Sequence, residues 1–177
     1  METPYEISLR EEYLAHERTR LREAWGELLR RFPWEWFVTL TFVCDVSEER
    51  AIKRFKVWIS QLNRHVYGHR WHTREPFGVS WACAIEWQKS GRIHLHPLVM
   101  GVRGARRLDW LDKWPDPESD PRGIAGYARV YPIENPNAVS RYLTKYVGKG
   151  GEILLSPNLK DFSGDLVSQA AGHRTDP

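Results

Sequence analysis

Two periodicities of hydrophobic residues divide the chain into predicted helices and strands. Residues 8–31 are rich in charge and carry evenly spaced leucines, which predicts a helix whose leucines face inward. These leucines are Leu14, Leu21 and Leu28. Pro33 ends this helix, and a second is expected after residues 45–48, which resemble a capping box. The hydrophobic face of the second helix comprises Ile52, Phe55, Ile59, Leu62 and Val66.

Strand-forming residues occupy much of the remaining chain. The run at 36–42 predicts one strand, and residues 124–133 predict another. Residues 79–87 and 92–100 flank Lys89-Ser90-Gly91, and a short loop that ends in glycine predicts a β-hairpin. A short helix is expected around Arg106 to Trp114. This order of elements predicts an α+β fold with a central antiparallel sheet of about five strands and helices packed on one face.

The predicted hairpin brings two histidines and a carboxylate together. If its strands pair symmetrically about Ser90, Glu86 lies opposite His94, and Ala84 lies opposite His96. Side chains alternate along a strand, so these residues share one face, and opposed side chains are close enough to bind one ion. The small alanines leave room for a metal and a phosphate. The other face carries apolar residues and is expected to be core; they are Cys83, Ile85, Trp87, Ile93 and Leu95.

The set Glu86, His94 and His96 indicates a catalytic metal site on the face of the sheet opposite the helices. Two imidazoles and one carboxylate leave coordination positions open, as catalytic metals require. Mn²⁺ or Mg²⁺ is the expected cofactor, because either ion would polarise a phosphoryl oxygen. Zn²⁺ also fits these ligands. The alternative is a pair of surface histidines on a half-exposed strand.

A helix is predicted from Ala138 to Lys149, after a capping asparagine and a proline in residues 134–137. Tyr142 and Tyr146 form one stripe on it, and Lys145 and Lys149 form another. A phenol has a pKa of about 10 in water, so it attacks phosphorus poorly without a nearby cation or base. A lysine on the same side of the helix can supply that help or hold the phosphate. Alternatively, the tyrosines pack against the sheet as structural residues.

Taken together, these motifs resemble those of the rolling-circle replication initiators of the HUH endonuclease superfamily. The strand at 36–42 matches the first motif, and His94-Leu95-His96 matches the second, with Glu86 as the acidic third ligand. The segment Tyr142-Leu143-Thr144-Lys145-Tyr146-Val147-Gly148-Lys149 matches the two-tyrosine form found in initiators of single-stranded DNA phages and some plasmids. The resemblance spans roughly residues 34–151, and three motifs in the right order are more specific than one. Relaxases carry their tyrosine before the histidines, which argues against that class.

The resemblance implies a ferredoxin-like or RRM-like sheet and a site-specific nickase and strand transferase. Glu86, His94 and His96 would hold the divalent ion, and Tyr142 or Tyr146 would attack the scissile phosphate, with Tyr146 slightly favoured. The products would be a 5′-phosphotyrosine bond and a free 3′-OH for a polymerase to extend. The expected partners are single-stranded DNA at a plasmid or viral origin, including hairpin forms, and a host helicase and polymerase. The sequence contains no Gly-x-x-x-x-Gly-Lys-Ser/Thr motif, so we expect either a host helicase or a chain that is the nuclease part of something larger.

Charge and composition refine this picture only slightly. The net charge of +3 is mildly basic, so DNA must bind at local patches. The candidate DNA-binding residues mix arginine with an aromatic ring; they are Arg70, Trp71, Arg74, Arg92, Arg103 and Arg106. Two cysteines and the lack of a long apolar run favour the cytosol and no membrane contact. We expect a helical extension over 1–33, an endonuclease domain over 34–151, and a loosely attached tail over 152–177.

Two alternatives share some of these features. A transposase that acts on single-stranded DNA ends would have the same histidines and tyrosine helix, although such enzymes often use one tyrosine. A sheet-based module that binds RNA or single strands without cutting them belongs to a different class. It gives no reason for Glu86, His94 and His96 to converge.

Overall fold

A computed structural model describes residues 3–73, 78–135, 143–146 and 152–159, and these form a five-stranded antiparallel sheet with helices. The strand order is β4-β1-β3-β2-β5, and each neighbouring pair is antiparallel. The prediction of an α+β fold is confirmed. The elements are α1 (Pro4–Leu29), β1 (Trp36–Phe42), α2 (Glu48–Tyr67), η1 (Trp71–Thr73), β2 (Ser80–Trp87), β3 (Ile93–Met100), η2 (Arg107–Trp110), β4 (Ala125–Pro132) and β5 (Ile153–Leu155).

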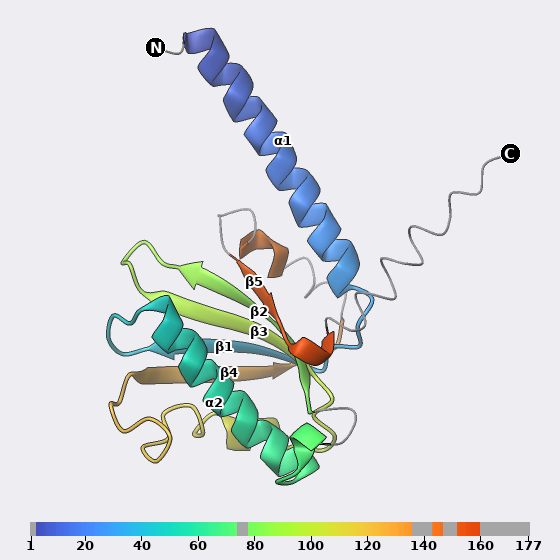
Figure 1. Cartoon of the computed structure of the whole chain (residues 1–177), viewed down its shortest axis with the longest axis vertical. Helices are drawn as coiled ribbons and strands as arrows, with labels where there is room; N and C mark the ends of the chain where they lie inside the picture. The colour runs from blue at the N-terminus through green and yellow to red at the C-terminus, as the bar shows by residue number, and fades with distance from the viewer. Residues whose placement is uncertain (1–2, 74–77, 136–142, 147–151, 160–177) are drawn as a thin grey trace, which may run out of the picture.

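The first face of the sheet is covered by α2, which lies across it in Figure 1. Ser47 caps this helix, and its hydroxyl accepts a hydrogen bond from the backbone N–H of Arg50 at 3.3 Å. Phe55 is completely buried and meets the Trp81 ring edge-on at a centroid distance of 4.9 Å. Alternate residues of the central strands complete the main core; they include Val38, Leu40, Cys83, Ile85, Ile93 and Leu95.

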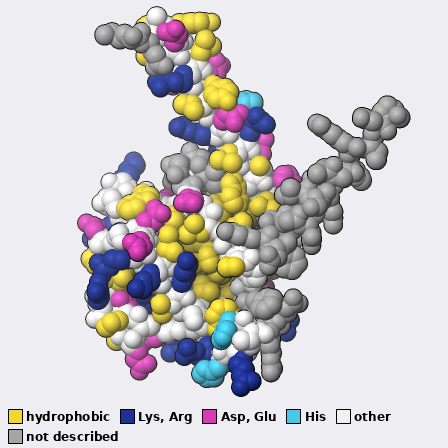
Figure 2. Space-filling view, viewed as in Figure 1, with side chains coloured by type: hydrophobic (Ala, Val, Ile, Leu, Met, Phe, Trp, Pro, Cys, Tyr) yellow, Lys and Arg dark blue, Asp and Glu magenta, His cyan; other side chains and the backbone are white. Residues whose placement is uncertain are grey.

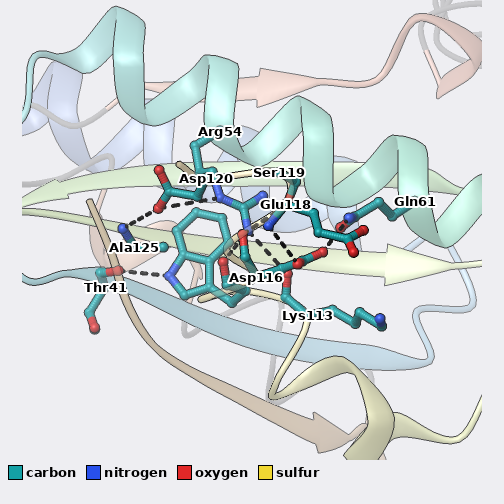
Figure 3. Close-up of polar contacts among 10 residues, drawn as sticks. Thr41, Arg54, Gln61, Lys113, Asp116, Glu118, Ser119, Asp120 and Ala125 are labelled. Atoms are coloured by element: carbon teal, nitrogen blue, oxygen red, sulfur yellow. Dashed lines mark hydrogen bonds and ion pairs between the residues drawn. The ribbon is translucent and has the colours of Figure 1, made fainter. Parts of the chain in front are cut away.

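The loop before β4 is fastened to α2 by a buried arginine (Figure 3). Arg54 is 4% exposed and donates to the carbonyls of Lys113, at 3.1 Å, and Trp114. Its guanidinium also lies over the Trp114 ring, 4.7 Å from the centroid. Asp120, 3.9 Å from the same guanidinium, accepts a hydrogen bond from the Ala125 N–H at 2.7 Å. Arg54 and Asp120 together therefore help to determine where β4 begins.

Among the described residues, the second face of the sheet carries apolar packing mainly over β2, β3 and β5, and this packing reaches Phe37 of β1. Leu29 at the end of α1, Leu143 and Leu159 are buried there in a second hydrophobic cluster. This cluster packs on the small residues Ala82 and Ala84 of β2. The structure thus places apolar segments on both faces, and the second face also carries Glu86, His94 and His96.

Most of α1 projects away from the sheet (Figure 1), contrary to the predicted inward orientation of its leucines. Leu14 and Leu21 are 42% and 51% exposed, and hydrophobic side chains are visible along the projecting helix in Figure 2. Leu28 is half-buried and packs on the second cluster. The helix itself was predicted correctly, but the leucine spacing does not reveal that only its last turn meets the sheet.

Two other segments differ from their prediction. Residues 152–159 were expected in a loose tail, whereas Ile153–Leu155 pair with Ala82–Ala84 as β5. A three-residue strand is too short to show a period in the sequence. The expected helix near Arg106 to Trp114 is the shorter 3₁₀ turn η2. Among the described residues, no helix is long and apolar enough to cross a membrane.

Candidate metal centre and tyrosine helix

The hairpin of β2 and β3 has the register predicted from its loop. Glu86 pairs with His94, and Ala84 pairs with His96. One potential ligand atom from each of Glu86, His94 and His96 lies within 4.8 Å of the other two. His96 is 4% exposed, whereas His94 and Glu86 are half-buried. The arrangement therefore has the ligand types of a divalent-metal site and remains accessible from one side.

The imidazole of His96 and the carboxylate of Glu86 already contact each other. His96 Nε2 lies 3.0 Å from Glu86 Oε2. Two ligand atoms that each bind one ion at about 2.1 Å lie roughly 3 Å apart when they occupy neighbouring coordination positions. The donor set thus fits a cation, because both atoms can turn lone pairs toward it once the imidazole nitrogen is unprotonated.

Each imidazole also contacts a second polar side chain through its other nitrogen. Gln88 Nε2 lies 2.9 Å from His94 Nδ1, and Thr39 Oγ1 lies 3.4 Å from His96 Nδ1. If an oxygen of these side chains accepts from Nδ1–H, the Nε2 lone pair is left for a metal; for Gln88 this requires its amide turned over. Sequence reasoning did not identify Gln88 or Thr39. Gln88 directly follows β2 and Thr39 lies on β1, so their contacts with histidine depend on the sheet register.

The surroundings favour the neutral form of His94. Burial lowers the pKa of its imidazole, and the nearby Arg92 lowers it further, while the charge of Glu86 opposes both effects. A neutral imidazole is the form that binds a metal. Cys83 faces the opposite side, and burial raises the pKa of its thiol well above the usual range, so it is not a candidate ligand.

The tyrosine segment lies directly over the histidine. The ring of Tyr146 stacks on His96 with a centroid distance of 4.4 Å and an interplanar angle of 8°. Tyr146 is 5% exposed, and Leu143, one turn earlier on the helix, is completely buried. Lys145 is exposed on the same short helical segment. Tyr142 and Lys149, the other predicted residues of this helix, lie outside the described residues.

The predicted DNA-binding residues fall into separate regions. Arg92 is exposed in the hairpin beside His94 and lies 3.8 Å from Asp45. Arg70 and Trp71 follow the end of α2, and Arg103 stacks its guanidinium on Tyr67 of that helix. Arg103 and Arg106 follow the end of β3, the end farther from His94. Arg74 lies outside the described residues. The structure therefore brings one of these arginines, Arg92, to the histidines.

Comparison with known proteins identifies the family. The family model for the replication-associated protein ORF2 matches residues 35–151, from the residue before β1 to two residues beyond the predicted tyrosine helix. Searches of the curated proteins and of the solved structures returned no match. The matched region contains the Glu86, His94 and His96 cluster and Tyr146 and covers more than half of the chain. The chain therefore belongs to the family of the replication-associated protein ORF2.

Proposed function

We propose that this chain is a metal-dependent, site-specific single-stranded DNA endonuclease and strand transferase of the HUH type. It would initiate rolling-circle replication of a plasmid or virus in the cytosol of a host cell. The observation that carries the proposal is the stack of Tyr146 on His96, which in turn contacts Glu86. A phenol, two imidazoles and a carboxylate therefore lie close together. The chain that carries them belongs to a family of replication-associated proteins.

Glu86, His94 and His96 are the residues that would hold Mn²⁺ or Mg²⁺. When bound, the ion would polarise a phosphoryl oxygen of the DNA and neutralise charge during phosphoryl transfer. Gln88 and Thr39 would hold the two imidazoles in the orientation that this requires. The carboxylate of Glu86 reduces the net charge of the site, which favours a divalent cation over an anion.

The proposed nucleophile is the phenolic oxygen of Tyr146 or Tyr142. It attacks the scissile phosphorus as the bond from phosphorus to the 3′ oxygen breaks, forming a 5′-phosphotyrosine. The phenolic proton leaves the nucleophile, and the departing 3′ oxygen gains a proton. Lys145 and Lys149 would lower the cost of forming the phenolate or hold the phosphate. A second tyrosine would allow the 5′ end to be passed on after a round of synthesis.

The proposed partners follow from these products. Single-stranded DNA at an origin, including a hairpin that exposes it, would be the substrate. A host polymerase would extend the free 3′-OH, and a host helicase would unwind the duplex ahead of it.

The experiment that tests this function is covalent trapping. The protein is incubated with Mn²⁺ and a diverse pool of labelled single-stranded oligonucleotides, and an adduct is sought that survives boiling in detergent. We expect an adduct that is lost in His96→Ala and in the Tyr142→Phe, Tyr146→Phe double variant, but kept in the matched control Tyr13→Phe on α1. Peptide mapping then names the tyrosine. Absence of any adduct with several divalent ions, despite DNA binding, would refute the endonuclease.

A further inference from the structure

The part of the second face that the hydrophobic cluster leaves open carries a row of unburied polar and aromatic side chains. Tyr127, Arg129 and Tyr131 alternate along β4, and all three are exposed. The exposed fractions are 81% for Tyr127 and 47% for Tyr131. A strand whose opposite side packs in the core through Val130 thus presents two aromatic rings with a cation between them.

This row, which we call the β4 strip, lies on the same face as the candidate metal centre. Tyr131 pairs with Phe37, and Arg129 pairs with Thr39, whose hydroxyl contacts His96. Opposed residues on neighbouring strands share a face. One strand, β1, separates the strip from β3, so two strand spacings of about 4.8 Å lie between β4 and the histidines.

A cleft joins Tyr127 of the β4 strip to the candidate metal centre. It has a volume of about 580 Å³ and is lined by both Tyr127 and His94. That volume lies in the range of small-ligand sites, roughly 300–1,000 Å³. Its walls also include Gln88, Ser90 and Arg92, so hydrogen-bonding groups and a cation face the same space as the aromatic ring.

We propose that the β4 strip and this cleft bind the unpaired DNA strand next to the scissile phosphate. Bases stack on Tyr127 and Tyr131, Arg129 contacts the phosphate backbone, and one nucleotide enters the cleft beside His94. Exposed rings alternating with a cation suit a single strand, because every base has a face for stacking and every linkage carries a negative charge. The inference rests on the proposed function for the identity of the substrate, but the binding it describes needs no metal and no cleavage.

The test measures binding without catalysis. Fluorescence anisotropy with a labelled mixed-sequence single-stranded oligonucleotide is recorded in EDTA for the wild type, Tyr127→Ala, Tyr131→Ala and Arg129→Ala. Loss of a stacked base is expected to weaken binding about 5- to 150-fold for each tyrosine variant. Tyr127→Trp, which keeps a ring for stacking, is expected to bind like the wild type. Tyr13→Ala removes a comparably exposed ring from α1 and is the matched control.

The outcomes separate this inference from the endonuclease proposal. The proposal that the β4 strip binds single-stranded DNA would be refuted by equal affinity in the wild type, Tyr127→Ala and Tyr131→Ala. It would also be refuted if the wild type bound no single strand. A matching loss in Tyr13→Ala would also overturn it, because the effect would then not be local. If the β4 variants lose binding and the wild type forms no covalent adduct, DNA binding by the β4 strip would be supported and the proposed endonuclease activity would be refuted. Thermal unfolding of each variant establishes that its fold is kept.

Discussion

The two faces of the sheet are built from the same strands but contain different chemistry. On the first face, β2 and β3 contribute Cys83, Ile85 and Leu95, which are buried under α2. On the second face, the alternate positions of the same strands carry Glu86, His94 and His96. The period of two along each strand lets one segment supply both a hydrophobic core and a candidate metal centre.

The comparison indicates how stability and activity are divided. Truncation on the first face removes buried apolar surface and leaves a cavity, so it should reduce the free energy of unfolding. Substitution of the polar residues on the second face should mainly reduce metal binding and DNA cleavage. Four predictions test this division between the faces.

The largest expected effect is on the first face. Phe55→Ala removes a completely buried ring that contacts Trp81, so we expect the free energy of unfolding to fall by about 3–5 kcal/mol. Leu21→Ala, at a 51% exposed position of α1, should change it by at most about 0.5 kcal/mol. Urea unfolding measures both values. A similar loss of unfolding free energy in the two variants would mean that α1 packs against the rest of the protein in solution. Stability would then not be concentrated under α2.

The next largest effect concerns the carboxylate of the second face. Glu86→Gln keeps the shape of the side chain but removes the negative charge that a divalent ion needs, so adduct formation with Mn²⁺ should fall by about 100-fold or more. The free energy of unfolding should change by about 1 kcal/mol or less, since Glu86 is only half-buried. The control is Glu49→Gln, an exposed position in the first turn of α2. Full adduct yield in Glu86→Gln would show that this carboxylate is not part of the proposed site.

A smaller effect is expected from the side chain that contacts His94. Gln88→Ala removes the hydrogen-bond partner of Nδ1, which should lower Mn²⁺ affinity about 10- to 100-fold without removing a ligand. Calorimetric titration measures the affinity, and Lys89→Ala in the same loop is the control. Unchanged affinity in Gln88→Ala would show that this contact does not orient the imidazole.

The smallest effect lies at the start of the helix that covers the first face. Ser47→Ala removes the cap of α2 and should lower the free energy of unfolding by about 1 kcal/mol. Ser47→Asp keeps an oxygen at the cap and should be close to the wild type. Adduct yield per folded molecule should not change in either variant. A selective loss of adduct in Ser47→Ala would show that the two faces are coupled.

The hairpin is the part of the site that could be predicted in most detail. The loop at Lys89-Ser90-Gly91 defines the pairing, and this places Glu86 opposite His94 without knowledge of any other element. The four longer strands and α2 were also predictable, because they have clear hydrophobic periods.

Contacts between elements could not be predicted in the same way. Gln88 and Thr39 were missed because neither a short motif nor a period marks a residue that contacts a histidine ring. The Tyr127-Ala128-Arg129-Val130-Tyr131 alternation does indicate an exposed aromatic face, but only the sheet order places it beside the histidines. The leucines of α1 were assigned to the core because spacing alone does not show whether a helix has a partner.

The most direct test of the account is a Mn²⁺ titration followed by electron paramagnetic resonance. We predict one bound ion in the wild type, which is lost in His94→Ala and retained in His65→Ala, a histidine that packs against Trp110 on the α2 side of the sheet. That result would assign the metal to the second face. Undiminished binding in His94→Ala, or equal loss in His65→Ala, would contradict the metal centre on which the proposed cleavage depends.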